Sequence, residues 1–169
     1  MKLKNILIAA VAAVATALPA TAQPFKHAQL LQTLDNMGMT ITVDDEFCVD
    51  HPGVLGAYIT IHEPHIALCP GGHVDELDLA TVRHEVGHAL QHCVNVKRGT
   101  NRDTPILPID VLSAKVNAIV PASDVVFIKS NYPRHKWLLE FEANYIERSY
   151  TPLQLIQLWN DGNCTEVLL

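Results

Sequence analysis

The segment 84–88 reads His-Glu-Val-Gly-His, and it carries the clearest chemical signal in the sequence. Residues four apart on an α-helix share a face, so His84 and His88 can bind one metal ion together. Glu85 is rotated by about 100° from His84, so its carboxylate lies beside the metal ion without binding it. A zinc ion lowers the pKa of its bound water toward about 7, and Glu85 would take the proton from that water. The motif therefore predicts a site for one zinc ion (Zn²⁺), with Glu85 as the general base.

A third protein ligand is expected, because a catalytic zinc ion usually has three and keeps one position open. The extended motif that ends in a third histidine is excluded, because residues 91 and 94 are glutamine and valine. The segment 139–144, Leu-Glu-Phe-Glu-Ala-Asn, offers instead two glutamates on a predicted helix. Glu140 and Glu142 lie about 200° apart around that helix, so only one of them can face the metal ion.

The geometry of this helix favours Glu140 as the ligand. Glu140, Asn144 and Glu147 form one polar stripe between apolar flanks, which suits a buried site. Glu142 falls outside the stripe, on an edge that we expect to be exposed to solvent. Glu140 is therefore the expected third ligand, and Glu142, His135 or an aspartate are the alternatives.

With these two segments, the chain resembles the gluzincins, zinc metallopeptidases whose third ligand is a glutamate on a second helix. The second segment is similar to the Glu-x-x-Ala-Asp or Glu-x-x-Ala-Asn segment of small gluzincins, which include prenyl-protein endopeptidases and phage-repressor-cleaving metallopeptidases. The resemblance implies that Glu140 binds zinc and that Asn144 supports the site. It also implies an endopeptidase with a zincin-like fold, in which one strand aligns the peptide substrate by main-chain pairing.

Two further roles have more than one candidate residue. His92 lies one turn beyond His88 on the same helix face, where it would either support the metal ligands or lie at the surface. An oxyanion-stabilising donor is also expected in such an enzyme. The candidates for this donor are Tyr132, His135, Tyr145 and Tyr150.

The elements that must position these residues follow from apolar periodicity and from proline and glycine signals. Residues 44–46 are expected to begin a polar connection, and residues 100–108 to form a loop. The pattern predicts an α+β, zincin-like fold with a short antiparallel or mixed sheet, an active-site helix and a helical C-terminal part. The expected strands are 39–43, 56–62 and 65–69, and the expected helices are 24–37, 74–94, 109–120, 123–131, 133–150 and 152–159.

Residues 1–22 are predicted to be a signal peptide. A basic start, an uncharged apolar run from Ile6 to Leu18 and small residues at Ala20 and Ala22 fit such a leader. A membrane anchor is disfavoured, because the run is short against the about 20 residues that span a bilayer. Residues 23–169 would then form one exported domain, periplasmic or extracellular, without a stable membrane anchor.

The sequence contains four cysteines, Cys48, Cys69, Cys93 and Cys164. An even number in an exported chain suggests two disulfides, with free buried thiols as the alternative. Three pairings are possible. We favour Cys48–Cys69, which closes a local hairpin-like segment, and Cys93–Cys164, which ties the tail to the central helix.

The composition, with 49% hydrophobic and 18% charged residues in 169, is typical of a globular protein. A net charge of −6 without a basic cluster argues against nucleic acid as a partner. We expect a zinc endopeptidase that acts on peptides or proteins. The alternatives are a non-catalytic zinc-binding or interaction module with the same fold, and a peptidase that is latent or specific for one partner.

Overall fold

The computed structural model describes residues 24–43, 45–60, 63–69, 79–100 and 104–165. The predicted signal peptide lies outside these residues. Within the described part, no helix is both long and apolar enough to cross a membrane. In chain order the elements are α1 (Pro24–Asn36), β1 (Thr40–Val43), α2 (Asp45–Asp50), β2 (Gly56–Ile59), β3 (His65–Leu68), α3 (Leu79–Lys97), α4 (Ile109–Ile119), α5 (Ala122–Asn131), η1 (Arg134–Lys136), α6 (Trp137–Ser149) and α7 (Pro152–Asp161).

The three strands form one small mixed sheet in the order β1–β3–β2. β1 runs parallel to β3, with Ile41 beside Ile66, and β2 runs antiparallel to β3, with Ala57 opposite Ala67. All four residues of β2 are buried. A short mixed sheet within an α+β fold confirms this part of the sequence prediction.

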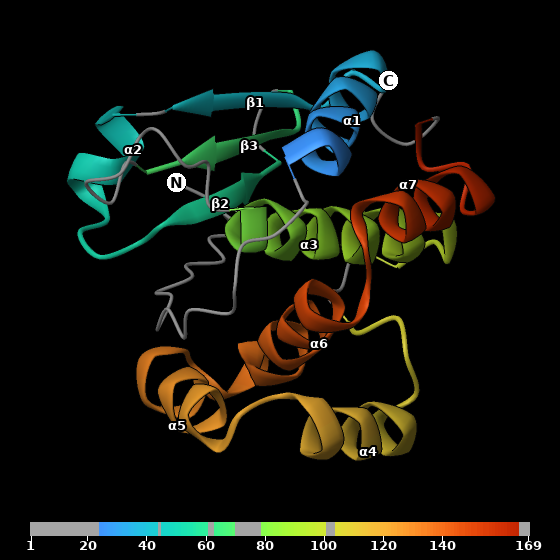
Figure 1. The fold of residues 1–169 in the computed structure, drawn as a ribbon. Helices are drawn as coiled ribbons and strands as arrows, with labels where there is room; N and C mark the ends of the chain where they lie inside the picture. Colours follow the sequence, from blue (N-terminus) through green and yellow to red (C-terminus); the bar gives the residue numbers. More distant parts are fainter. Residues whose placement is uncertain (1–23, 44, 61–62, 70–78, 101–103, 166–169) are drawn as a thin grey trace.

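Helix α3 is the centre of the molecule (Figure 1), with the sheet on one side and α6 on the other. Its apolar side chains, among them Val86 and Leu90, join a core cluster with Leu34 from α1, Ile66 from β3 and Trp159 from α7. The helix is apolar on one face, so it covers the sheet and packs against α7 there.

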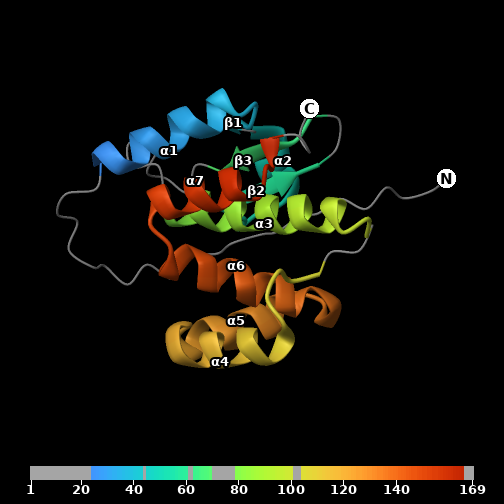
Figure 2. The same ribbon diagram turned by 90° about the vertical axis from the view of Figure 1, so that its right-hand side faces the viewer.

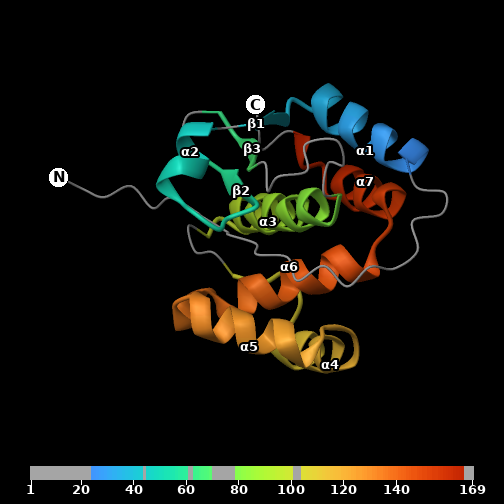
Figure 3. The ribbon, with the colours of Figure 1, turned by 60° about the vertical axis from the view of Figure 1, so that its left-hand side comes forward.

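α6, α5 and α4 form further layers below α3, as two turned views show (Figures 2 and 3). α6 lies directly against α3, and both α4 and α5 pack against the far side of α6. The buried residues Leu112 and Val116 of α4 and Ile128 of α5 anchor this outer layer. α6 is therefore enclosed between two helical layers.

Both favoured disulfides are present. Cys48–Cys69 links α2 to the end of β3, and Cys93–Cys164 links α3 to the segment after α7. Their Cα–Cα distances are 5.4 Å and 5.5 Å. Two disulfides are compatible with an exported protein.

The structure also corrects the expected elements. Residues 45–50 form the helix α2 where a polar connection was expected; the stacked rings of Phe47 and His51 lie one turn apart there. The helix predicted for 133–150 begins instead with the 3₁₀ turn η1 after Pro133, and the α-helix α6 follows from Trp137. α3 continues to Lys97, where Gly99 in a left-handed conformation (φ 66°) follows its end.

Candidate metal centre

The two motifs face each other where α3 and α6 pack most closely. A Cβ atom on Gly87 would lie 3.3 Å from the Cα atom and 3.5 Å from the Cβ atom of Ala143. The glycine and the alanine are therefore small because the helix backbones approach each other there. This contact brings Glu140, one turn before Ala143, against the face of α3 that carries His84 and His88.

His84, His88 and Glu140 form a buried group that could hold one metal ion. One ligand atom from each residue lies within 4.8 Å of the others. The Glu140 Oε2 atom is 3.4 Å from His84 Nε2 and 3.7 Å from His88 Nε2. The three expected ligands therefore converge, and they are at most 1% exposed.

The unsatisfied atoms of this group fit a bound cation. Within the described part of the chain, the Oε2 atom of Glu140 and both carboxylate oxygens of Glu85 are buried without a hydrogen bond of normal geometry, although the main-chain N–H of Tyr58 lies close enough to Glu85 to lower its pKa. Buried polar atoms are rarely left in this state, because the loss of hydration costs about 1–3 kcal/mol for each group. Two imidazoles and a carboxylate are also a donor set that suits zinc.

In the metal-free protein, a proton on His84 supplies the positive charge. Burial lowers the pKa of His84, but the carboxylates of Glu140 and Glu147 outweigh it and raise the pKa to about 10. For Glu140, burial raises the pKa, but His88 and His84 outweigh it and bring it down to about 2. The site is thus organised to hold a positive charge among carboxylates.

Glu85 lies in the same cluster without belonging to the ligand group. Its side chain is fully buried, and burial raises its pKa to about 7, against the opposing effect of His84 and His88. β2 lies against α3 at this point: a Cβ atom on Gly56 would be only 3.4 Å from the Cγ atom of Glu85. A carboxylate with a pKa near neutrality is suited to accept and return a proton.

Two contacts behind the ligands were not assigned from the sequence. Glu147 lies two turns after Glu140 on the same stripe of α6, and its Oε2 atom is 3.4 Å from His84 Nδ1. Gln91 Oε1 lies 2.8 Å from His88 Nδ1. Each histidine thus turns Nε2 toward the cluster; Nδ1 of His88 is hydrogen-bonded to Gln91, whereas Nδ1 of His84 has only the longer charged contact with Glu147. The signal for Glu147 was its place on the polar stripe, and the signal for Gln91 was its position three residues after His88.

The expectation that Glu142 lies on a solvated edge is wrong. Its side chain is buried with 0% exposure, and it accepts hydrogen bonds from the main-chain N–H groups of Ile106 and Leu107, both at 2.7 Å. Burial still raises its pKa. The periodicity of α6 could not reveal this, because the donors come from a segment about 35 residues away. Glu142 does not belong to the ligand group in the described residues.

Asn144 and His92 form hydrogen bonds near the candidate metal centre, but not with the candidate ligand atoms themselves. Asn144 Nδ2 donates to the main-chain oxygen of Glu140 at 3.1 Å, so its contact is with the backbone that carries the ligand. His92 is partly buried, and its Nδ1 atom lies 3.0 Å from the hydroxyl of Tyr58 on β2. His92 thus connects α3 to the sheet.

The candidates for an oxyanion donor are separated by the fold. The carboxylates of Glu140 and Glu85 add to the burial that raises the pKa of Tyr132, so Tyr132 lies in the field of the cluster. Tyr145 and Tyr150 pack against each other, and Lys115 lies over the ring of Tyr145. The charge environment therefore connects Tyr132 to the candidate metal centre.

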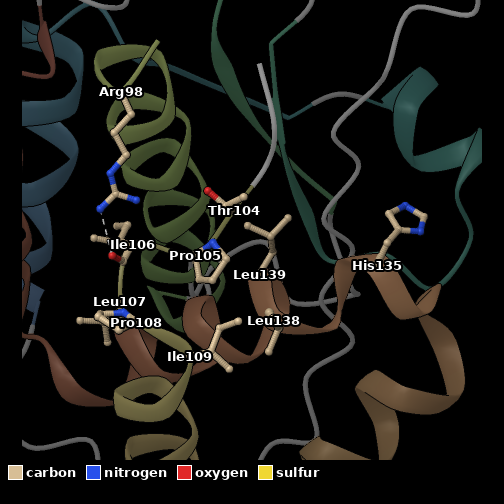
Figure 4. A pocket seen from close by; sticks show the side chains of 10 residues that line it. All are labelled: Arg98, Thr104, Pro105, Ile106, Leu107, Pro108, Ile109, His135, Leu138 and Leu139. Atoms are coloured by element: carbon tan, nitrogen blue, oxygen red, sulfur yellow. Dashed lines mark hydrogen bonds between the residues drawn. The ribbon is translucent and has the colours of Figure 1, made fainter. Parts of the chain in front are cut away.

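A pocket of about 480 Å³ lies beside the start of α6 (Figure 4). Residues 104–109, the end of α3 at Arg98, and Leu138 and Leu139 on α6 line it. His135, considered above as a ligand or donor, lies on its wall and outside the ligand group. Leu139 precedes Glu140, so the pocket is next to the ligand helix.

Comparisons with protein-family models, with curated proteins and with solved structures found no match to this chain. Any assignment of function therefore depends on the site itself.

Proposed function

We propose that this protein is a zinc-dependent endopeptidase of the gluzincin type, exported from the cell. The observation that carries the proposal is a fully buried Glu85, with a pKa raised by its burial, beside the candidate ligand group of His84, His88 and Glu140. A buried carboxylate beside a candidate metal site lowers the stability of the fold, and such destabilising groups are typical of catalytic sites. Three ligands in the described residues also fit a zinc ion with one open position.

The residues divide the work of peptide hydrolysis. Zinc, when bound, supplies Lewis acidity and makes water acidic enough to lose a proton near neutral pH. His84, His88 and Glu140 hold the ion, and Gln91 orients the ring of His88. Glu85 accepts the proton of the attacking water and returns it to the leaving amine. Tyr132 is the candidate whose surroundings best suit a donor to the oxyanion.

We further propose that β2 aligns the peptide substrate. β2 is at an edge of the three-stranded sheet, and its Gly56 lies over Glu85. An extended peptide can add to such an edge through main-chain hydrogen bonds. This would place the scissile carbonyl above the base and the metal ligands, in a zincin-like arrangement.

The test compares bound zinc and casein hydrolysis for the wild type and Glu85→Gln. We expect hydrolysis to fall on the order of 10²- to 10⁴-fold, with zinc still bound, because Glu85 is not a ligand. Glu63→Gln makes the same chemical change at an exposed position and should leave both quantities unchanged. Unchanged hydrolysis in Glu85→Gln would exclude the proposed mechanism.

A substrate specific to one partner would make casein uninformative. The same pair of proteins is then incubated with a mixture of secreted proteins, and the cleavage products are compared. Products that form with the wild type but not with Glu85→Gln support a selective peptidase. Zinc binding without any such product in either assay would instead favour the non-catalytic binding module.

A further inference from the structure

The side-chain amide of Gln91 can be oriented from its contacts alone. One of its ends lies 3.0 Å from the main-chain oxygen of Leu139 and 3.0 Å from Oε2 of Glu142, and both of these atoms are acceptors. Only the NH₂ group of an amide can donate to two acceptors, so this end is Nε2. The other end, at 2.8 Å from His88 Nδ1, is therefore the oxygen Oε1.

This orientation determines the tautomer of His88. The oxygen of an amide can only accept a hydrogen bond, so Nδ1 of His88 must carry the proton and donate the bond. Nε2 of His88 then keeps its lone pair on the side of His84 Nε2, which is 3.1 Å away, and of Glu140. His88 thus presents to the cluster the nitrogen that a metal ion requires.

Glu142 keeps the amide of Gln91 in this orientation. Its carboxylate accepts from Gln91 and from the main-chain N–H groups of Ile106 and Leu107, so it is itself held from a third segment. A flipped amide would place the Gln91 oxygen against the oxygens of Glu142 and Leu139. The connection therefore runs from the segment before α4, through α6, to a ligand on α3.

We propose that Gln91 and Glu142 are positioning residues, which fix the Nδ1–H tautomer and the ring orientation of His88 for metal binding. The proposal deepens the proposed function, because it rests on the same ligand group. It does not depend on peptide hydrolysis. Partners that bond to ligating histidines in this way commonly contribute a factor of about 10–100 to metal affinity.

The first experiment reads the tautomer of His88 from the ¹⁵N shifts and two-bond correlations of its ring, in the metal-free and in the zinc-loaded protein. We expect a protonated Nδ1 in both states of the wild type. In Gln91→Met, which keeps the length but removes both polar ends, we expect a mixture of tautomers without metal. Zinc affinity, from competition with a chelator, should fall on the order of 10- to 100-fold.

The matched control is Gln157→Met, the same change at an exposed position on α7. It should alter neither the tautomer nor the zinc affinity. An unprotonated Nδ1 in wild-type His88 would overturn the proposal, as would a Gln91→Met protein with unchanged tautomer and affinity. Hydrolysis is not part of this readout, so the result stands whether or not the protein cleaves peptides.

A second pair of variants addresses the case in which Gln91→Met does not fold. Gln91→Glu keeps the acceptor for His88 but turns an oxygen toward Glu142, so zinc affinity should fall. Adding Glu142→Gln restores a donor opposite an acceptor between α3 and α6, but turns the same NH₂ group toward the main-chain N–H of Ile106. We therefore expect the double variant to lose less zinc affinity than the sum of the losses in the two single variants, and purely additive losses would contradict the proposal.

Discussion

The two sides of α3 differ in what they bury. On the side of the sheet, Val86 and Leu90 join the apolar core, and the Cys93–Cys164 disulfide fixes the helix to the tail. On the side of α6, ionisable side chains are buried beside the apolar Ala143 and Ile146, and two of them, Glu85 and Glu140, have oxygens without a hydrogen bond of normal geometry within the described structure. One helix thus stabilises the fold with one face and carries a destabilising cluster on the other.

This difference teaches where the stability for the site comes from. Burying apolar side chains stabilises a protein by about 1.5–3 kcal/mol for each large residue, whereas unpartnered buried carboxylates oppose folding. The apolar face of α3 and the outer layer of α4 and α5 therefore hold together an interface that would not form by itself. Substitutions on the two faces should then have opposite effects on stability.

The largest effect is expected on the apolar face. Leu90→Ala should lower the free energy of unfolding by about 2–5 kcal/mol, because it leaves a cavity in a closed core. Zinc affinity of the folded protein should change little, because Leu90 points away from the ligands. Denaturant unfolding and chelator competition measure the two quantities. A loss of zinc affinity without a loss of stability would show that the two faces are not separable.

Glu85→Gln should raise the free energy of unfolding of the metal-free protein near neutral pH, whereas Leu90→Ala lowers it. The pKa of Glu85 is raised from 4.5 to about 7, so the unfolded chain loses this proton at a lower pH than the folded chain. Stability linked to Glu85 is therefore fully present below pH 4.5 and is lost as the pH rises to about 7. The shift corresponds to an effect of roughly 3 kcal/mol.

The measurement is the free energy of unfolding of both proteins from pH 4 to pH 8, without metal. The variant should lack the decrease between pH 4.5 and 7 and be the more stable protein at pH 7.5. Glu85 is one of the carboxylates that raise the pKa of His84, so this pKa should be less raised in the variant, with an effect on stability mainly above pH 6.5. If the free energies of unfolding of the two proteins changed with pH in parallel, the pKa of Glu85 would not be raised in the folded protein.

The smallest effect on stability is expected where the two motifs touch. In Gly87→Ala, the gain in helix propensity of about 1 kcal/mol opposes the crowding against Ala143 and Ile146. The net change in the free energy of unfolding should therefore stay within about 1 kcal/mol. Gly87→Leu cannot fit without moving α6, so it should weaken zinc binding more than Gly87→Ala does. Equal zinc affinities in both variants would contradict the claim that the contact between Gly87 and Ala143 positions Glu140.

The candidate ligand group was predictable because each motif is local. The spacing of His84 and His88 places them on one helix face in any fold, and the choice of Glu140 over Glu142 followed from angles around one helix. The disulfide pairing Cys93–Cys164 was also found, because α3 and the tail each carry a single cysteine. The short α2 was missed, because a segment of six residues carries too little periodicity to predict a helix.

The sequence by itself indicated the candidate ligand group, the candidate base and the central helix, since these depend on helical spacing within a few residues. Only the tertiary structure decided which polar residues stand behind the ligands. Gln91 meets Glu142 across 51 residues of chain, and Glu142 meets the main chain of Ile106 and Leu107. Main-chain donors leave no trace in residue types, and burial of a charged side chain depends on which segments cover it. For that reason Glu142 looked like a surface residue in the sequence, whereas in the fold it supports the candidate metal centre.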